Sequence, residues 1–193
     1  MQEYKIDIVL PDGNIEKINV EENTKIEELA KKYNPFFKNQ VILSIYNGKL
    51  RELCKKIERD GKIEFLTIAD RDGRRTYRRS VILLLQRAVQ KLYGDEVELK
   101  VLHSLGEGYY CEIINLNKSV LKLHEDDISS IKKTMDQLVQ QNIPITKSSE
   151  KTQAAEEMFA GLGMKDKERL LHYRRSSRVN IYELDGIKDY FYG

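Results

Sequence analysis

Five arginines and a tyrosine are concentrated in one short stretch of the chain. Residues 71 to 79 contain five arginines and one aspartate, which gives the stretch a formal charge of +4. Guanidinium groups match the geometry of phosphate oxygens, and a tyrosine ring offers a surface for base stacking. The stretch therefore predicts contacts with RNA or a nucleotide, through Arg74, Arg75, Tyr77, Arg78 and Arg79, with Arg71 beside them. The alternative is a solvated helix start with surface ion pairs, although arginines near a helix N-terminus oppose the helix dipole.

The histidines and cysteines form no set typical of catalysis or metal binding. His103, His124 and His172 lack the spacing of metal ligands. Cys54 and Cys111 have no C-x-x-C partner, and no histidine lies close in sequence to activate Cys111. We therefore assign no catalytic residue and no metal ligand in this chain.

Two further groups are candidates for binding. Tyr109 and Tyr110 follow a Gly-Glu-Gly sequence that lacks the P-loop pattern and reads as a turn between two strands. We expect one of these rings in the core and the other lining a cleft. Arg174, Arg175 and Arg178 form a second basic cluster that could join the first one in space.

The first third of the sequence predicts a small β-grasp module. Apolar alternation indicates a hairpin over residues 4–10 and 15–20. A short helix is expected from about Lys25 to Tyr33, with Thr24 as its N-cap and Pro35 ending it. Two more strands are expected over residues 41–46 and 62–68.

The remainder predicts a larger α+β domain. A polar, glycine-containing stretch at residues 69–73 is the expected linker. Apolar residues recur at helical spacing over residues 76–92, 125–141 and 150–160. Strands are expected over residues 97–102, 109–114 and 179–184. The predicted fold is thus α+β, with domains at residues 1–68 and 74–193.

The order of elements in the first domain resembles the TGS domain, the ubiquitin-like module found at the start of threonyl-tRNA synthetases. The segment from Asn47-Gly48-Lys49-Leu50 to Ile63-Glu64-Phe65-Leu66-Thr67 carries most of the resemblance. The resemblance implies a regulatory or RNA-contacting module without catalytic residues.

Residues 73–193 resemble the editing domain shared by threonyl- and alanyl-tRNA synthetases. The resemblance rests on Tyr77-Arg78, on Ala88-Val89-Gln90-Lys91-Leu92-Tyr93 and on Gly106-Glu107-Gly108-Tyr109-Tyr110. In that family two histidines on the long helix, with a later cysteine and histidine, can hold a zinc ion that activates water. The matching positions here are Arg79, Leu83 and a site near Phe191, and the chain ends before the fourth. The scaffold is therefore expected without its metal site.

The pairing of a TGS module with a histidine-less editing-like domain resembles the N-terminal half of bacterial uridine kinase-like nucleoside kinases. That resemblance implies a chain truncated at its C-terminal end and linked to a P-loop kinase domain, which would bind ATP and Mg²⁺. The present segment would then sense a ligand, bind RNA or position the kinase.

Two alternatives remain open. One is a threonyl-tRNA synthetase-related editing or tRNA-binding protein, for which Glu107, Asp185 and Asp189 are the nearest water-activating candidates. The other is a stand-alone RNA-binding module, whose binding should weaken steeply with salt.

Composition limits the classes of protein that fit. The chain has 193 residues, is 40% hydrophobic and 33% charged, and carries a net charge of only +2, so a nucleic-acid surface must be a local patch. The longest apolar run is too short to cross a bilayer, and the N-terminus lacks a signal-peptide core. A cytoplasmic location without membrane partners is the expectation.

Overall fold

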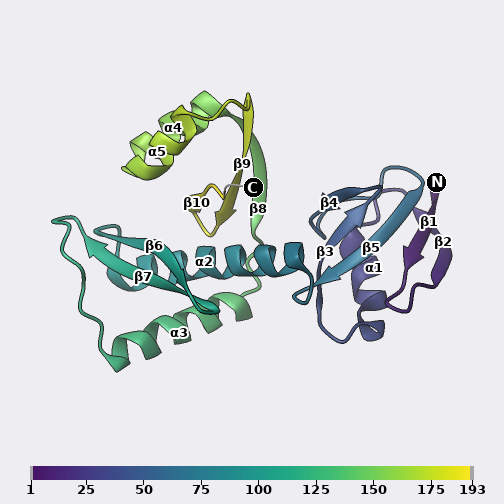
Figure 1. The fold of residues 1–193 in the computed structure, drawn as a ribbon, viewed down its shortest axis with the longest axis horizontal. Helices are drawn as coiled ribbons and strands as arrows, with labels where there is room; N and C mark the ends of the chain where they lie inside the picture. Colours follow the sequence, from purple (N-terminus) through teal and green to yellow (C-terminus); the bar gives the residue numbers. More distant parts are fainter. Residues whose placement is uncertain (1, 192–193) are drawn as a thin grey trace. The chain divides into compact units, whose positions relative to one another are not determined.

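The computed structural model describes residues 2 to 191 and has the predicted α+β fold (Figure 1). The chain divides into two compact units, one up to Arg79 and one from Ser80 onward. The division falls inside helix α2 (Arg71–Tyr93). The assignment of the first unit to a TGS domain stays a prediction.

The first unit is a five-stranded mixed sheet with one helix. The strand order is β2-β1-β5-β3-β4, with β1 and β5 parallel and the other neighbours antiparallel. Asn47 and Gly48, both at positive φ, form the tight turn between β3 and β4. The strands are β1 (Glu3–Val9), β2 (Ile15–Glu21), β3 (Val41–Tyr46), β4 (Lys49–Arg51) and β5 (Gly61–Thr67).

Helix α1 (Ile26–Tyr33) covers the buried face of this sheet, and a 3-10 turn, η1 (Asn34–Phe36), follows it at Pro35. Its N-cap is Lys25 rather than the expected Thr24, because the Lys25 backbone N–H donates to the Glu28 carboxylate at 3.0 Å. Ile6, Ile8 and Ile63 are fully buried beneath the helix. The period-2 alternation of β1 and β5 thus produces the core of this unit.

Helix α2 begins earlier than predicted, at Arg71 instead of about Thr76, so part of the expected linker is helical. The Asp70 carboxylate accepts from the backbone N–H of Thr67 at 2.7 Å and from its hydroxyl at 3.1 Å, which fixes the turn before the helix. Gly73 is buried, and a Cβ at this position would lie 2.0 Å from the Thr67 carbonyl oxygen. Gly73 is therefore a close-packing residue of the first helical turn and not a flexible hinge.

The second unit combines helices with two small antiparallel sheets. β6 (Val97–Leu105) and β7 (Gly108–Asn115) form a hairpin, and a second sheet has the order β10-β9-β8. The strands of that sheet are β8 (Thr146–Lys151), β9 (Arg178–Leu184) and β10 (Ile187–Asp189). The helices are α3 (Glu125–Gln140), α4 (Thr152–Gly161) and α5 (Lys165–His172).

Two buried clusters hold the second unit together. One lies between α2, the β6–β7 hairpin and α3 and contains Ala88, Val89 and Ile113. The other lies between α4, α5 and β9 and centres on Phe159, which is fully buried. Among residues 2–191, no helix is long and apolar enough to cross a membrane.

Candidate nucleic-acid interface

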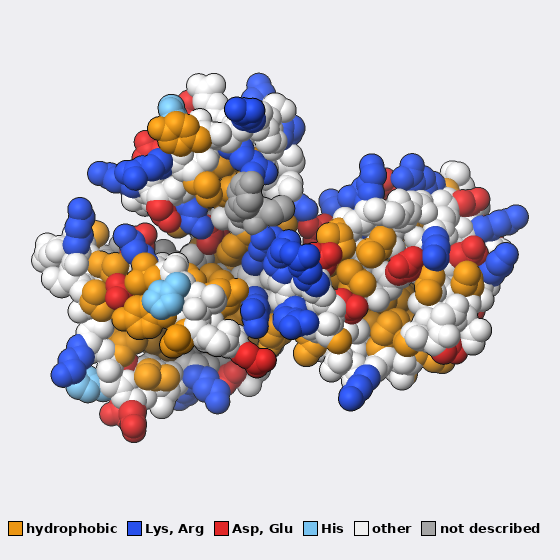
Figure 2. All heavy atoms as spheres, viewed as in Figure 1, with side chains coloured by type: hydrophobic (Ala, Val, Ile, Leu, Met, Phe, Trp, Pro, Cys, Tyr) orange, Lys and Arg blue, Asp and Glu red, His pale blue; other side chains and the backbone are white. Residues whose placement is uncertain are grey.

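The predicted arginine cluster lies on the first turns of α2, and Figure 2 shows basic side chains gathered there. Tyr77 is 53% exposed beside them. Arg71, Arg74 and Arg75 are also exposed, whereas Arg78 and Arg79 are half-buried. The structure thus brings together the predicted residues of this segment on one continuous helix.

The contacts of Arg74 and Arg75 leave most of their charge uncompensated. One guanidinium nitrogen of Arg74 donates to the Ala69 carbonyl at 3.2 Å, which is a neutral partner. Arg75 lies 4.0 Å from the carboxylate of Asp72, at the limit of an ion pair between exposed side chains. Asp72 therefore offsets little of the positive charge of Arg75.

The spacing of the arginines is unfavourable for the helix itself. Arg71 and Arg75, Arg74 and Arg78, and Arg75 and Arg79 are like-charged pairs four residues apart. Each such pair costs an isolated helix roughly 0.2–0.5 kcal/mol, and cations in the first turns also oppose the helix dipole. A bound anion would relieve both effects, which supports the binding interpretation over the solvated helix start.

The positions where the editing family places metal ligands do not form a metal site. Leu83 is 1% exposed, so an apolar side chain fills the place of one histidine. Arg79 cannot ligate a metal ion because it stays protonated. Among residues 2–191, no group of three or more His, Cys, Asp or Glu side chains could hold a metal ion.

Tyr109 and Tyr110 lie on β7, in the other compact unit from Tyr77. They are 41% and 43% exposed, so the expectation that one of them lies in the core is wrong. The reason is that the distal end of the β6–β7 hairpin packs against nothing within residues 2–191 on either face, since the residues from Leu102 to Tyr110 are all exposed and none belongs to the buried cluster of α2 and α3. His103 stacks on Tyr110, with ring centroids 5.2 Å apart. The two tyrosines thus stay candidates for stacking, without a shown connection to the arginines of α2.

Cys111, the next residue on β7, is half-buried. Burial raises the pKa of its thiol, which keeps the group protonated at neutral pH. This agrees with a structural thiol rather than a nucleophile.

A buried polar network involves two of the acidic residues considered for water activation. Asp189 is 1% exposed, and its carboxylate contacts Lys167 Nζ at 2.5 Å and Gln86 Nε2 at 3.0 Å. Asp185, in the β9–β10 turn, accepts from Arg87 at 2.8 Å and lies 3.7 Å from Lys91. The hydrogen bond from Arg87 lowers the pKa of Asp185. Both carboxylates therefore act as charged anchors between α2 and the β9–β10 hairpin.

This network was not predictable as a contact set, because its partners lie far apart in sequence. Gln86 and Asp189 are separated by 103 residues, and Arg87 and Asp185 by 98. The one available signal was the Asp-Gly pair at residues 185 and 186, which indicates a tight turn. Glu107, the third acidic candidate, is exposed in the turn of the β6–β7 hairpin.

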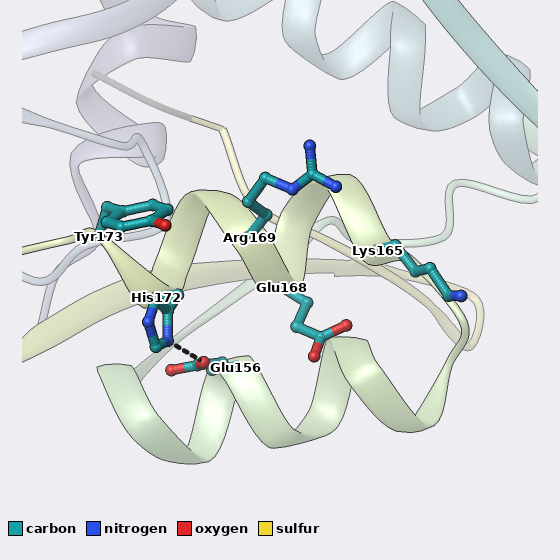
Figure 3. A pocket seen from close by; sticks show the side chains of 6 residues that line it. All are labelled: Glu156, Lys165, Glu168, Arg169, His172 and Tyr173. Atoms are coloured by element: carbon teal, nitrogen blue, oxygen red, sulfur yellow. Dashed lines mark hydrogen bonds and ion pairs between the residues drawn. The ribbon is translucent and has the colours of Figure 1, made fainter.

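Two of the surface pockets formed by the described residues lie in the second unit. A pocket of about 270 Å³ between α4 and α5 is lined by charged side chains; in Figure 3, His172 points to Glu156, and their contact measures 2.9 Å. Another, of about 340 Å³, lies between the β6–β7 hairpin and the start of α5 and mixes lysines such as Lys100 with acids such as Glu98. Because both signs of charge line each pocket, neither indicates a ligand class.

Comparison with known proteins points to one group of enzymes. No protein-family model matches the chain. The chain is 28% identical over 177 residues, 92% of its length, to the threonine–tRNA ligase of Syntrophotalea carbinolica. It is 30% identical over 80% of its length to that of Staphylococcus carnosus, and 31% identical over 81% to that of Staphylococcus aureus. The chain spans only 23 to 27% of the length of these relatives.

The likeness to threonine–tRNA ligases extends through most of both compact units. None of the three relatives named here is a nucleoside kinase, so the comparisons lend no support to the kinase hypothesis.

Proposed function

We propose that this chain is an RNA-binding module related to threonyl-tRNA synthetases, with tRNA as its target. The observation that carries the proposal is the arginine cluster on α2, in which the exposed Arg74 and Arg75 are poorly compensated by neighbouring acids. The similarity to threonine–tRNA ligases supports tRNA as the class of RNA. The buried Leu83 favours binding over hydrolysis, since this position offers no ligand for a metal ion.

The physical basis of the proposed binding is phosphate neutralisation. Exposed guanidinium groups on one helix can contact successive phosphates, and each contact releases condensed counterions. Tyr77, exposed among the arginines, can stack on an unpaired base next to those phosphates. The binding should therefore be strongly dependent on salt and only moderately dependent on RNA sequence.

The test is titration of the protein with labelled tRNAThr transcript at several salt concentrations. We expect the double variant Arg74→Ala/Arg75→Ala to reduce the slope of log affinity against log salt by about 2, since each lost phosphate contact removes about 1. The matched control is Lys17→Ala/Arg59→Ala, which removes the same charge from exposed positions outside α2, one of them on the edge strand β2. An equal effect of both double variants would show that only net charge matters and would contradict the proposal.

A further inference from the structure

A second basic segment lies at the end of α5 and in the loop that leads into β9. Between residues 169 and 178 the chain carries four arginines and no acid. Figure 2 shows basic side chains over this loop. The segment has the same formal charge as the cluster on α2, and it too contains one tyrosine, Tyr173.

Tyr173 stands out among the apolar and aromatic side chains of the described residues. It is 78% exposed at the C-terminal cap of α5, with its ring edge-on to His172 at 5.0 Å. His172 is held in turn by the Glu156 carboxylate at 2.9 Å. In Figure 3, Tyr173 lies past the end of α5, whereas Arg169 points away from α4. A ring so exposed gains little from burial, and most of its surface is open to a ligand.

Two of the arginines around this ring, Arg169 and Arg175, are exposed, although Glu156 and Glu168 line the same pocket as Arg169. Within residues 2–191, neither Arg169 nor Arg175 forms an ion pair with a carboxylate, and both are exposed. Arg178 binds only neutral partners, the hydroxyl of Ser149 at 3.0 Å and its carbonyl. Lys151 is the cross-strand partner of Arg178, a pairing of like charges that costs the sheet stability.

The loop that carries these residues is fixed by hydrogen bonds. The Arg174 N–H donates to the Leu171 carbonyl at 2.9 Å, and the Thr152 N–H donates to the Ser177 carbonyl at 3.1 Å. The Thr152 hydroxyl donates to the carbonyl oxygen of Ser176. The Ser176 hydroxyl in turn donates to the carbonyl oxygen of Arg178. The surface is therefore preorganised, which lowers the entropic cost of binding.

We propose that Tyr173, Arg169 and Arg175 form a second RNA contact, in which an unpaired base stacks on the Tyr173 ring and the arginines bind the adjacent phosphates. This inference rests on the proposed function, because it assumes that the protein binds RNA. The combination of an exposed ring and unneutralised guanidinium groups is typical of sites for single-stranded RNA. A membrane surface fits less well, because the segment exposes one large ring and not an apolar face.

The test compares a labelled single-stranded RNA of about ten nucleotides with a duplex containing the same strand. Tyr173→Ala should weaken binding of the single strand by about 5- to 100-fold and leave binding of the duplex unchanged, since paired bases cannot stack on the ring. Tyr173→Phe should stay within about twofold of the parent, because stacking needs only the ring. The control is Phe36→Ala. It removes another exposed ring that belongs to neither basic segment.

The outcomes separate this inference from the proposed function. If Arg74→Ala/Arg75→Ala weakens RNA binding and Tyr173→Ala does not, the α2 site stands and the second contact is overturned. An equal loss on single strand and duplex would also overturn base stacking. If Tyr173→Ala weakens binding of the protein to anionic phosphatidylglycerol vesicles but leaves its RNA binding unchanged, the surface binds lipid instead. Failure of the parent protein to bind either RNA at low salt would overturn both proposals.

Discussion

At the scale of single residues, the buried carboxylate of Asp189 depends on Lys167. The pair measures 2.5 Å, with Asp189 1% and Lys167 19% exposed. Lys167→Met should destabilise the protein by about 3 kcal/mol, because it leaves a buried charge with only neutral partners. Urea unfolding measures the change. The double variant Lys167→Met/Asp189→Asn should recover part of the loss, and a double variant no more stable than the single one would contradict the argument.

The neighbouring Asp185 predicts a pH dependence. Its pKa is lowered by the hydrogen bond from Arg87, so its ion pair stabilises the fold above the unfolded pKa of about 3.9. That contribution is lost as the pH falls through the lower, folded pKa. Asp185→Asn should therefore flatten the loss of stability below about pH 4, as followed by thermal unfolding at a series of pH values. Asparagine tolerates the positive φ of this position, so backbone strain does not confuse the result.

At the scale of elements, the start of α2 depends on one glycine. Gly73→Ala places a methyl group 2.0 Å from the Thr67 carbonyl oxygen, so the helix or the preceding turn must shift. We expect a loss of about 1–3 kcal/mol in unfolding free energy. Gly161→Ala in α4 is the matched control, since nothing lies within 4 Å of its Cβ. It should stabilise by up to about 1 kcal/mol, and equal effects of the two variants would refute the packing role of Gly73.

Elements with strong periodicity were predictable from sequence, and short or polar ones were not. The apolar spacing in α2 and α3 and the alternation in β1 and β2 gave these elements to within a few residues. β8 is almost wholly polar and exposed, and β10 has three residues, so neither carries a period. Their place is set by pairing with β9, which depends on contacts distant in sequence.

The residues of the candidate site were likewise predictable only where local sequence determines their position. The arginines of α2 were predictable because they lie together in sequence. The exposure of both Tyr109 and Tyr110 depends on the distal end of the β6–β7 hairpin lying outside the buried cluster, which periodicity does not reveal. The exposed position of Tyr173 depends on α5, because Tyr173 is the C-cap of that helix. Helix α5 was not predicted from the sequence.

At the scale of the whole molecule, the separate cores predict separate unfolding. The cluster beneath α1 lies wholly in the first unit, and the clusters around Val89 and Phe159 lie wholly in the second. Ile63→Ala should cost the first unit about 2–5 kcal/mol and Phe159→Ala the second about 3–5 kcal/mol. Hydrogen exchange resolved by peptide should show each variant weakening protection mainly in its own unit. Loss of protection in both units from either variant would mean that the two cores unfold as one cooperative structure, with α2 coupling them.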